Sequence, residues 1–325
     1  MSAQGDFKIP AAVQPKTADY TYDLDRALSC VVSLSSRIPD EAFTAETLGT
    51  ERAGNGVVIH EDGLVLTIGY LVTEAETVWL TTHDGRSVPA HVVGIDAVTG
   101  FGLVQALGRL DLPALPLGRS DSLKLGQRAV VAGGGGRRQS LAVELVARQE
   151  FAGYWEYVLD EALFTAPCHP HWGGTALIGP AGDLLGIGSL QLQQGDSSGS
   201  AKAINMVVPI DLLPPILDDL RTRGRADRPA RPWLGLFATE TSDGVVVMGL
   251  ADDGPAEAAG ISGGDVVVAV AGEPVPDLAG FFRQVWALGE AGARVPLTVR
   301  RDGREIALSV TSADRDRFLV GPQLH

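Results

Sequence analysis

The residues best suited to chemistry in this sequence lie together between positions 165 and 175. Cys168 supplies a thiol, and His169 and His171 supply imidazoles on either side of a proline. A thiol can act as a nucleophile when an imidazole lies within hydrogen-bond reach and a third group orients that imidazole. The hydroxyl of Thr175 is a second candidate nucleophile in the same segment. The segment therefore leaves a hydrolytic enzyme open as one hypothesis.

The thiol and imidazoles of Cys168, His169 and His171 are also ligands that zinc or copper accepts. A mononuclear zinc site needs at least three protein ligands, and adjacent residues rarely supply them all. The histidines at positions 60, 83 and 91 are scattered singly and form no second cluster. Metal binding through this segment is therefore a weak alternative, and we expect no metal and no other cofactor.

The composition excludes several classes of function. Forty acidic residues against 26 basic ones give a net charge of −14, which repels phosphate backbones, so we expect no nucleic-acid partner. No apolar run reaches the length of about 18 residues that a membrane helix needs, and the first residues lack the pattern of a signal peptide. Two distant cysteines form no disulfide framework. These features predict a cytoplasmic protein without a membrane segment.

The elements that must position the 165–175 segment are mostly strands. Short apolar runs recur along the chain, separated by turn signals such as Asp62-Gly63 and Asp84-Gly85. The sequence contains 40 glycines and 19 prolines, a content that favours turn-rich β structure. We predict strands at 28–34, 56–59, 64–67, 78–82, 88–95, 129–132, 141–147, 154–164, 175–178, 184–192 and 203–208. Many short strands with little helix indicate a sandwich or a pair of barrels.

The composition changes after position 220 and divides the chain. Residues 221–231 are charged and contain glycine and proline, which is typical of a linker. Pro255 can open a short helix, and Asp277 can cap a longer one. We predict an N-terminal arm at 1–24, a large β domain at 25–220, the linker at 221–231, a small α+β domain at 232–313 and a C-terminal tail at 314–325.

Three segments carry a family resemblance when they are taken in order. They are Gly54-Asn-Gly-Val-Val-Ile-His-Glu-Asp-Gly-Leu-Val-Leu-Thr67, Asp84-Gly-Arg86 followed by residues 90–96, and Ala203-Ile-Asn-Met-Val-Val-Pro-Ile-Asp211. The chain resembles the HtrA/Deg family of trypsin-like proteases with a C-terminal PDZ domain. The resemblance implies a mainly β protein, with a trypsin-like double β-barrel over 25–220 and a PDZ domain over 232–313. It also makes a homo-oligomer possible, because such proteins are often trimers.

The resemblance places unexpected residues at the three catalytic positions of the family. Tyr70 stands at the histidine, Gly100 at the aspartate and Trp172 at the serine. A phenol with an ordinary pKa near 10 is a poor base at neutral pH, and glycine has no group that orients an imidazole. An indole has no nucleophilic atom, because its nitrogen is only a hydrogen-bond donor.

The position of the oxyanion-hole glycine is also changed, to Pro170. Proline has no amide hydrogen, and the loss of one such donor slows acyl transfer by about 10²- to 10³-fold. With the triad altered as well, we expect a pseudoprotease that is not an enzyme. A residual protease, or a hydrolase that uses Cys168 or Thr175, remains the alternative.

The C-terminal domain retains more of its family pattern. Pro232-Trp-Leu-Gly-Leu-Phe237 resembles the loop whose backbone amides hold the C-terminal carboxylate of a peptide in PDZ domains. The expected peptide-binding residues are Trp233, Leu234, Gly235, Leu236, Phe237, Leu278, Phe282 and Val285. The resemblance therefore implies a scaffold or regulator whose partners are peptides or protein C-termini.

Overall fold

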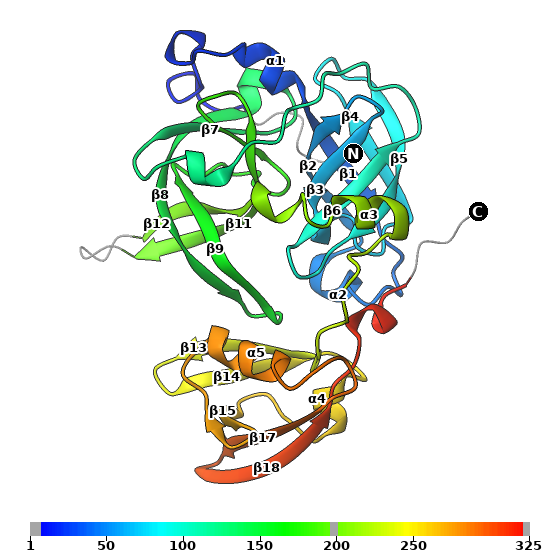
Figure 1. Cartoon of the computed structure of the whole chain (residues 1–325), viewed down its shortest axis with the longest axis vertical. Coiled ribbons are helices and arrows are strands. Elements are labelled where there is room, and N and C mark those ends of the chain that lie inside the picture. The colour runs from blue at the N-terminus through cyan, green and yellow to red at the C-terminus, as the bar shows by residue number, and fades with distance from the viewer. Residues whose placement is uncertain (1–7, 196–200, 321–325) are drawn as a thin grey trace. The chain divides into compact units, whose positions relative to one another are not determined.

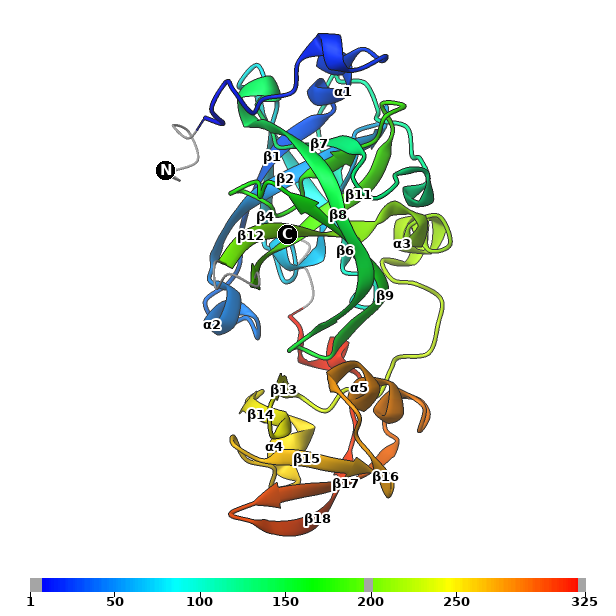
Figure 2. The ribbon, with the colours of Figure 1, turned by 90° about the vertical axis from the view of Figure 1, so that its left-hand side faces the viewer.

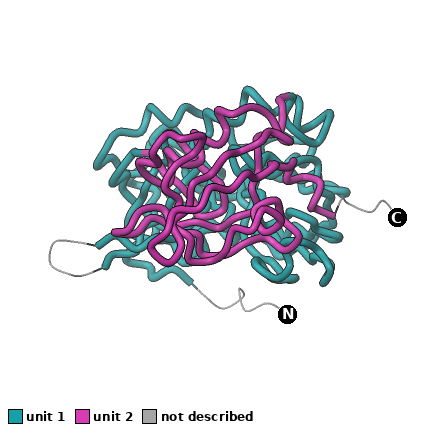
Figure 3. Tube along the Cα trace, turned by 90° about the horizontal axis from the view of Figure 1, so that it is seen from below, with its two compact units in different colours: residues 1–149, 161–227, 321–325 teal, residues 150–160, 228–320 magenta. Residues whose placement is uncertain are grey.

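The computed structural model describes residues 8–195 and 201–320 and divides into two compact units (Figure 3). Unit 1, teal in the figure, contains residues up to 149 together with 161–227. Unit 2, magenta, contains residues 150–160 together with 228–320. The second unit therefore includes a short segment from the middle of the large β domain.

The first half of unit 1 is a closed barrel in the strand order β1-β2-β3-β6-β5-β4 (Figure 1). Neighbouring strands are antiparallel, and Gly56 of β2 faces Val32 of β1. The six strands are β1 (Val31–Arg37), β2 (Glu51–His60), β3 (Leu64–Ile68), β4 (Thr77–Thr81), β5 (Ser87–Ile95) and β6 (Phe101–Ala106). Every residue of β3 is buried, as expected for a strand inside a packed barrel.

The second half of unit 1 is another closed barrel, in the order β10-β11-β12-β9-β8-β7. Its strands are β7 (Arg128–Ala132), β8 (Ser140–Gly153), β9 (Tyr157–Ala166), β10 (Ala176–Ile178), β11 (Leu184–Gly195) and β12 (Ala201–Pro209). β8 and β9 form a long hairpin, green in Figure 2. The segment from 167 to 175 connects β9 to β10.

Unit 2 is built on a sheet with the strand order β13-β14-β15-β17-β18, in which β16 pairs with β15. The strands are β13 (Leu236–Thr241), β14 (Gly244–Leu250), β15 (Val266–Val270), β16 (Glu273–Pro274), β17 (Arg294–Arg301) and β18 (Arg304–Thr311). Helix α5 (Leu278–Trp286) begins at Asp277, whose carboxylate accepts from the amide of Gly280 at 2.6 Å. Its buried face joins the core of the unit, because apolar residues recur three or four positions apart.

The remaining helices are short. They are α1 (Leu24–Ser29), α2 (Ala45–Leu48), α3 (Leu217–Arg223) and α4 (Pro255–Ala258), with 3₁₀ turns at Thr17–Asp19, Gly69–Leu71, Ser120–Ser122, Gly136–Gln139, Ile210–Leu212 and Arg315–Phe318. Within the described residues, no helix is long and apolar enough to cross a membrane. Two closed barrels and a small α+β unit confirm the predicted mainly β class.

Candidate functional sites

Tyr70 and Trp172, at two of the three predicted catalytic positions, contact each other. Tyr70 lies in the 3₁₀ turn Gly69–Leu71 that follows β3, and its hydroxyl donates to the carbonyl oxygen of Ser189 at 2.9 Å. The hydroxyl oxygen also accepts from the side chain of Trp172, whose indole N–H is its donor. Burial raises the pKa of the Tyr70 phenol well above its usual range. The phenol is therefore held neutral and cannot serve as a base near pH 7.

Gly100 stands at the third predicted catalytic position and supplies only backbone groups there, with no carboxylate. Its φ of +83° is left-handed, a conformation that glycine adopts without steric cost, and its carbonyl accepts from the amide of Gly69 at 2.6 Å. Asp96 is a buried carboxylate nearby in sequence, but its Oδ2 accepts from the amide and hydroxyl of Thr99, at 2.9 and 2.7 Å. Asp96 thus stabilises its own turn.

Asn55 anchors the segment that carries Trp172. Its side-chain amide donates to the carbonyls of His171 and Gly173, at 3.0 and 2.9 Å, and its Oδ1 accepts from the amide of Gly134 at 2.9 Å. The backbone amide of Asn55 also donates to Gly173, at 2.9 Å. Gly174 must be glycine, because a Cβ there would lie 1.9 Å from the carbonyl oxygen of Asn55. These contacts hold residues 171–174 against Asn55 of β2.

The imidazole of His169 is committed to structural hydrogen bonds. Its Nδ1 accepts from the amide of His171 at 3.1 Å, so its Nε2 carries the hydrogen and donates to the carbonyl of Gln139 at 3.0 Å. Burial lowers the pKa of His169, which keeps the ring neutral. The backbone amide of His169 donates to Oδ1 of Asn205 at 2.6 Å. This buried histidine therefore stabilises the conformation of the loop through its hydrogen bonds.

Neither candidate nucleophile of the segment is activated. Burial raises the pKa of the Cys168 thiol, opposed by a 3.1 Å contact from the Asn205 side-chain amide, so the protonated and unreactive form is favoured. The hydroxyl of Thr175 donates to the carbonyl of Trp172 at 2.8 Å. Among the residues that the structure describes, no group of three or more His, Cys, Asp or Glu side chains is arranged to hold a metal ion. Among the described residues, no further His, Cys, Asp or Glu side chain thus joins Cys168, His169 and His171 as a metal ligand.

In unit 2, the loop that leads into β13 holds a carboxylate. Oε1 of Glu156 accepts from the amides of Leu234, Gly235 and Leu236, at 3.1, 2.8 and 3.3 Å. Oε2 accepts from Leu234 as well, at 3.1 Å. The left-handed φ of Gly235, +73°, turns the loop so that successive amides point to one place. Three adjacent amides therefore form a carboxylate-binding loop, the 234–236 loop.

The other predicted peptide-binding residues surround this loop or lie in the core behind it. The ring of Trp233 lies 4.7 Å from that of Phe318, and Phe237 lies edge-to-face with Tyr154 at 6.1 Å. Leu278, Phe282 and Val285 of α5 are almost fully buried in the core cluster of unit 2. Peptide binding by these eight residues stays a prediction.

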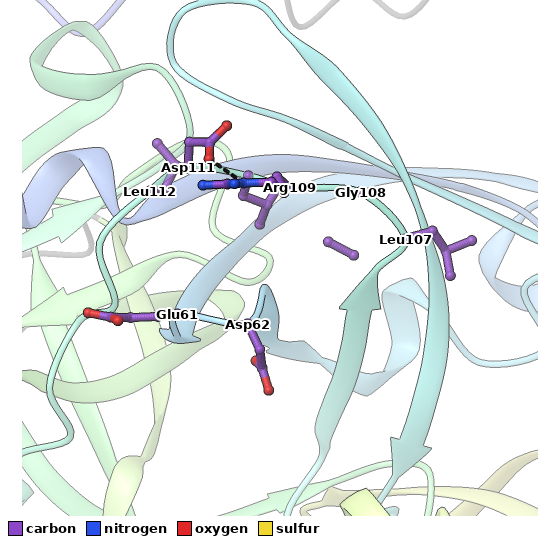
Figure 4. Close-up of a pocket in the computed structure, with 9 residues that line it drawn as sticks. Glu61, Asp62, Leu107, Gly108, Arg109, Asp111 and Leu112 are labelled. Carbon is purple, nitrogen blue, oxygen red and sulfur yellow. Dashed lines mark hydrogen bonds and ion pairs between the residues drawn. The ribbon is translucent and has the colours of Figure 1, made fainter.

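A pocket also lies on the first barrel (Figure 4). It is lined by Glu61, Asp62 and residues 106–112, and Arg109 pairs with Asp111 across 2.9 Å on its rim. Both charged side chains of that pair are substantially exposed, so the pair is of the weak surface type. The pocket shares no lining residue with either site.

The comparisons with known proteins define the class of both units. Residues 54–187 match the family described as "Trypsin-like peptidase domain", and residues 232–311 match the family described as "PDZ domain". The chain is therefore a trypsin-like peptidase domain followed by a C-terminal PDZ domain, the organisation of HtrA-, DegP- and DegS-type proteins.

The relatives with this organisation are proteases by name. A "Probable periplasmic serine endoprotease DegP-like" of Pseudomonas fluorescens is 30% identical over 79% of this chain and 55% of its own length. The "Serine endoprotease DegS" of Salmonella typhimurium is 23% identical over 90% of this chain and 85% of its own. A solved structure, "HtrA-type protease AlgW with decapeptide", has a TM-score of 0.54 at 22% identity and covers 92% of this chain and 98% of its own, which shows the shared fold. The chain spans about half the length of the DegP-like relatives.

These names correct two of our predictions. The prediction that the chain is not an enzyme is wrong for its class, because the relatives are named serine endoproteases. It rested on the residues at four positions, Tyr70, Gly100, Trp172 and Pro170, and these four residues do not define the activity of a family. The prediction of a cytoplasmic location is contradicted too, since the DegP-like relatives are named periplasmic. Acidic composition and an unremarkable N-terminus do not distinguish these compartments.

Sequence reasoning did not find Asn55 or Glu156. Asn55 lies inside the Gly-Asn-Gly motif that carried the resemblance, and a polar side chain flanked by two glycines in a buried strand was an available signal. Glu156 lies in the run Phe151-Ala-Gly-Tyr-Trp-Glu-Tyr157, whose four aromatic residues surround a single carboxylate. Such a run on a hairpin turn indicates a contact surface, though not its partner.

Proposed function

We propose that this chain binds peptides or protein C-termini through its PDZ domain and acts as a scaffold or regulator. One observation carries the proposal: the amides of the 234–236 loop converge on a carboxylate at 2.8 to 3.3 Å. A peptide terminus presents the same group, and backbone amides recognise it whatever the neighbouring side chains are. The PDZ family match supports this assignment.

We propose further that positions 70, 100 and 172 do not perform Ser–His–Asp chemistry. The hydrogen bond between the Trp172 indole and the Tyr70 phenol occupies the positions of nucleophile and base with two groups that hold each other. Neither group is an acceptor of protons near pH 7, and Gly100 has no carboxylate. This proposal concerns the groups at these three positions. We also propose that this chain is periplasmic, because the DegP-like relatives are named periplasmic.

A library of peptides with free C-termini tests the binding function. Full-length chain is applied to each sequence twice, once as the free acid and once as the C-terminal amide. We expect ligands whose signal falls at least about tenfold on amidation, because the amide removes the charge that the loop amides hold. Equal signal for acid and amide across the library contradicts carboxylate recognition.

A separate assay tests the second proposal. The chain is incubated with casein and with a fluorophosphonate that labels activated serines. We expect no labelling, since no serine stands at position 172. Casein cleavage that disappears in Cys168→Ala or Thr175→Ala would show that another nucleophile serves the site.

A further inference from the structure

The carboxylate in the 234–236 loop belongs to this chain, 78 residues upstream of Leu234. Glu156 lies at the tip of the β8–β9 hairpin, within the 150–160 segment that forms one compact unit with residues 228–320. Both of its carboxylate oxygens accept hydrogen bonds from the loop. The position that the proposed function gives to a peptide terminus is therefore filled by an internal side chain.

The backbone of the hairpin tip also contacts the strand that follows the loop. The amide of Ala238 in β13 donates to the carbonyl of Tyr154 at 3.0 Å. β13 lies at the edge of its sheet, with β14 on its other side. Such an edge is where a peptide strand adds to a PDZ domain. The hairpin tip thus contacts both parts of the domain that would recognise a peptide, the loop amides and the edge of β13.

Apolar and charged side chains hold the rest of the tip. Val158 is 8% exposed and belongs to the core cluster of unit 2. Arg283 of α5 pairs with Glu150 and Asp160, each at 2.5 Å, on the two arms of the hairpin. These ion pairs are substantially exposed and contribute little, so the tip is held mainly by its buried contacts, among them Val158, the Tyr154–Phe237 ring pair and the hydrogen bonds of Glu156.

The backbone at Glu156 adopts a conformation that is unfavourable for most residues other than glycine, as it also does at Ala271. The φ of Glu156 is +60°, in the left-handed region where glycine and asparagine are favoured and other residues cost of order 1 kcal/mol or more. A glycine at this turn position would remove the strain but also the carboxylate. The observed residue keeps the carboxylate in spite of the strain.

We propose that the 150–160 hairpin tip is an internal ligand of the PDZ domain, with Glu156 in the place of a peptide C-terminus. The inference rests on the proposed peptide-binding function and deepens it. A free α-carboxylate and the Glu156 carboxylate cannot share the same three amides, so a peptide binds only after the tip leaves. The domain is thereby closed to weak ligands and open to those that outcompete the tip.

Hydrogen exchange of the loop tests the docking without any peptide. Exchange at the amides of 234–236 is compared in the full chain, in Glu156→Ala, in Glu156→Gln and in the matched control Glu144→Gln, an exposed glutamate on β8, the strand that leads into the hairpin tip. We expect exchange at least about tenfold faster in Glu156→Ala, an intermediate rate in Glu156→Gln, and the original rate in the control. Equal rates in all four proteins overturn the proposal.

A competition experiment separates this proposal from the proposed function. A pool of fluorescein-labelled nonapeptides with free C-termini is titrated with wild type and with Glu156→Ala. Affinity about tenfold higher for the variant supports an internal competitor, whereas equal measurable affinity overturns it. If exchange rises in Glu156→Ala and neither protein binds the pool, the internal docking stands and the peptide-binding function fails.

Discussion

The Tyr70 hydroxyl accepts from the Trp172 indole and donates to the carbonyl of Ser189, so this one oxygen joins two segments that lie far apart in sequence. A buried polar group is costly when its partner is removed, because the loss leaves a donor or acceptor without solvation. At the scale of single residues, Tyr70 and Trp172 therefore form a structural contact at two of the positions that the family resemblance predicts to be catalytic. Glu156 has a similar role, because its carboxylate accepts hydrogen bonds from backbone amides that would otherwise lack a partner side chain.

Tyr70→Phe tests the structural role of that contact. It leaves the Ser189 carbonyl and the Trp172 indole without their partner, and we expect a loss of about 1–3 kcal/mol in the free energy of unfolding by urea. Tyr22→Phe is the matched control, since the buried Tyr22 hydroxyl has no hydrogen-bond partner among the described residues. The control should lose nothing or gain slightly. A similar loss in both variants contradicts the account.

The docking of Glu156 should depend on pH. Burial raises the pKa of its carboxyl from 4.5 to about 7, against the lowering by the loop amides and by Arg315. Below pH 4.5 the carboxyl of Glu156 is protonated whether the tip is docked or free, so docking does not depend on pH there. Between pH 4.5 and 7 only the docked form keeps its proton, so docking weakens as the pH rises. Above pH 7 the carboxyl is ionised in both forms, and docking weakens no further. The other charges against the tip are Arg283, Glu150 and Asp160.

The amide resonance of Gly235 reports this titration. We expect its chemical shift to move with a midpoint near pH 7 in wild type and to stay flat over that range in Glu156→Gln. A midpoint near 7 in both proteins would assign the titration to another group.

At the scale of elements, the connection between β9 and β10 depends on glycine where the chain approaches its neighbours closely. Gly174 and Gly136 both have left-handed φ, +74° and +70°. A Cβ at Gly174 would meet the Asn55 carbonyl at 1.9 Å, whereas a Cβ at Gly136 would meet nothing within 4 Å. The two glycines share a backbone conformation but differ in their surroundings. Comparing them therefore distinguishes the cost of the left-handed conformation from the cost of a steric clash.

Gly174→Ala and Gly136→Ala form a matched pair for this connection. Both replacements cost about 1 kcal/mol from the backbone conformation, and the first must also displace Asn55. We expect Gly174→Ala to destabilise the chain by at least about 2 kcal/mol more than Gly136→Ala in urea unfolding. Equal losses would show that the segment adjusts freely.

The sequence predicted the elements better than their ends. Turn signals such as Asp62-Gly63 located the hairpins, because these residues have local conformational preferences. The strand expected at 141–147 extends to Gly153, and the one expected at 154–164 is Tyr157–Ala166. The difference lies in the hairpin tip, where Phe151, Trp155 and Tyr157 pack on one another. The carboxylate-binding loop was predicted from its motif, but its occupant was not, since a contact across 78 residues leaves no local pattern.

At the scale of the whole molecule, the chain combines a peptidase domain and a PDZ domain in an acidic protein. The net charge of −14 is a property of the whole chain that attracts basic groups, an attraction that salt screens. The peptidase domain shares its fold with endoproteases, while the positions that we predict to be catalytic hold a tyrosine, a glycine and a tryptophan. Recognition of a carboxylate by the 234–236 loop is the central claim at this scale.

Calorimetric titration of Glu156→Ala tests that claim most directly, because the variant lacks the internal competitor. One peptide selected from the library is titrated as the free acid and as the C-terminal amide, at pH 7.5. We predict that the free acid binds at least about tenfold more tightly than the amide. Equal affinities for the two forms would contradict this claim.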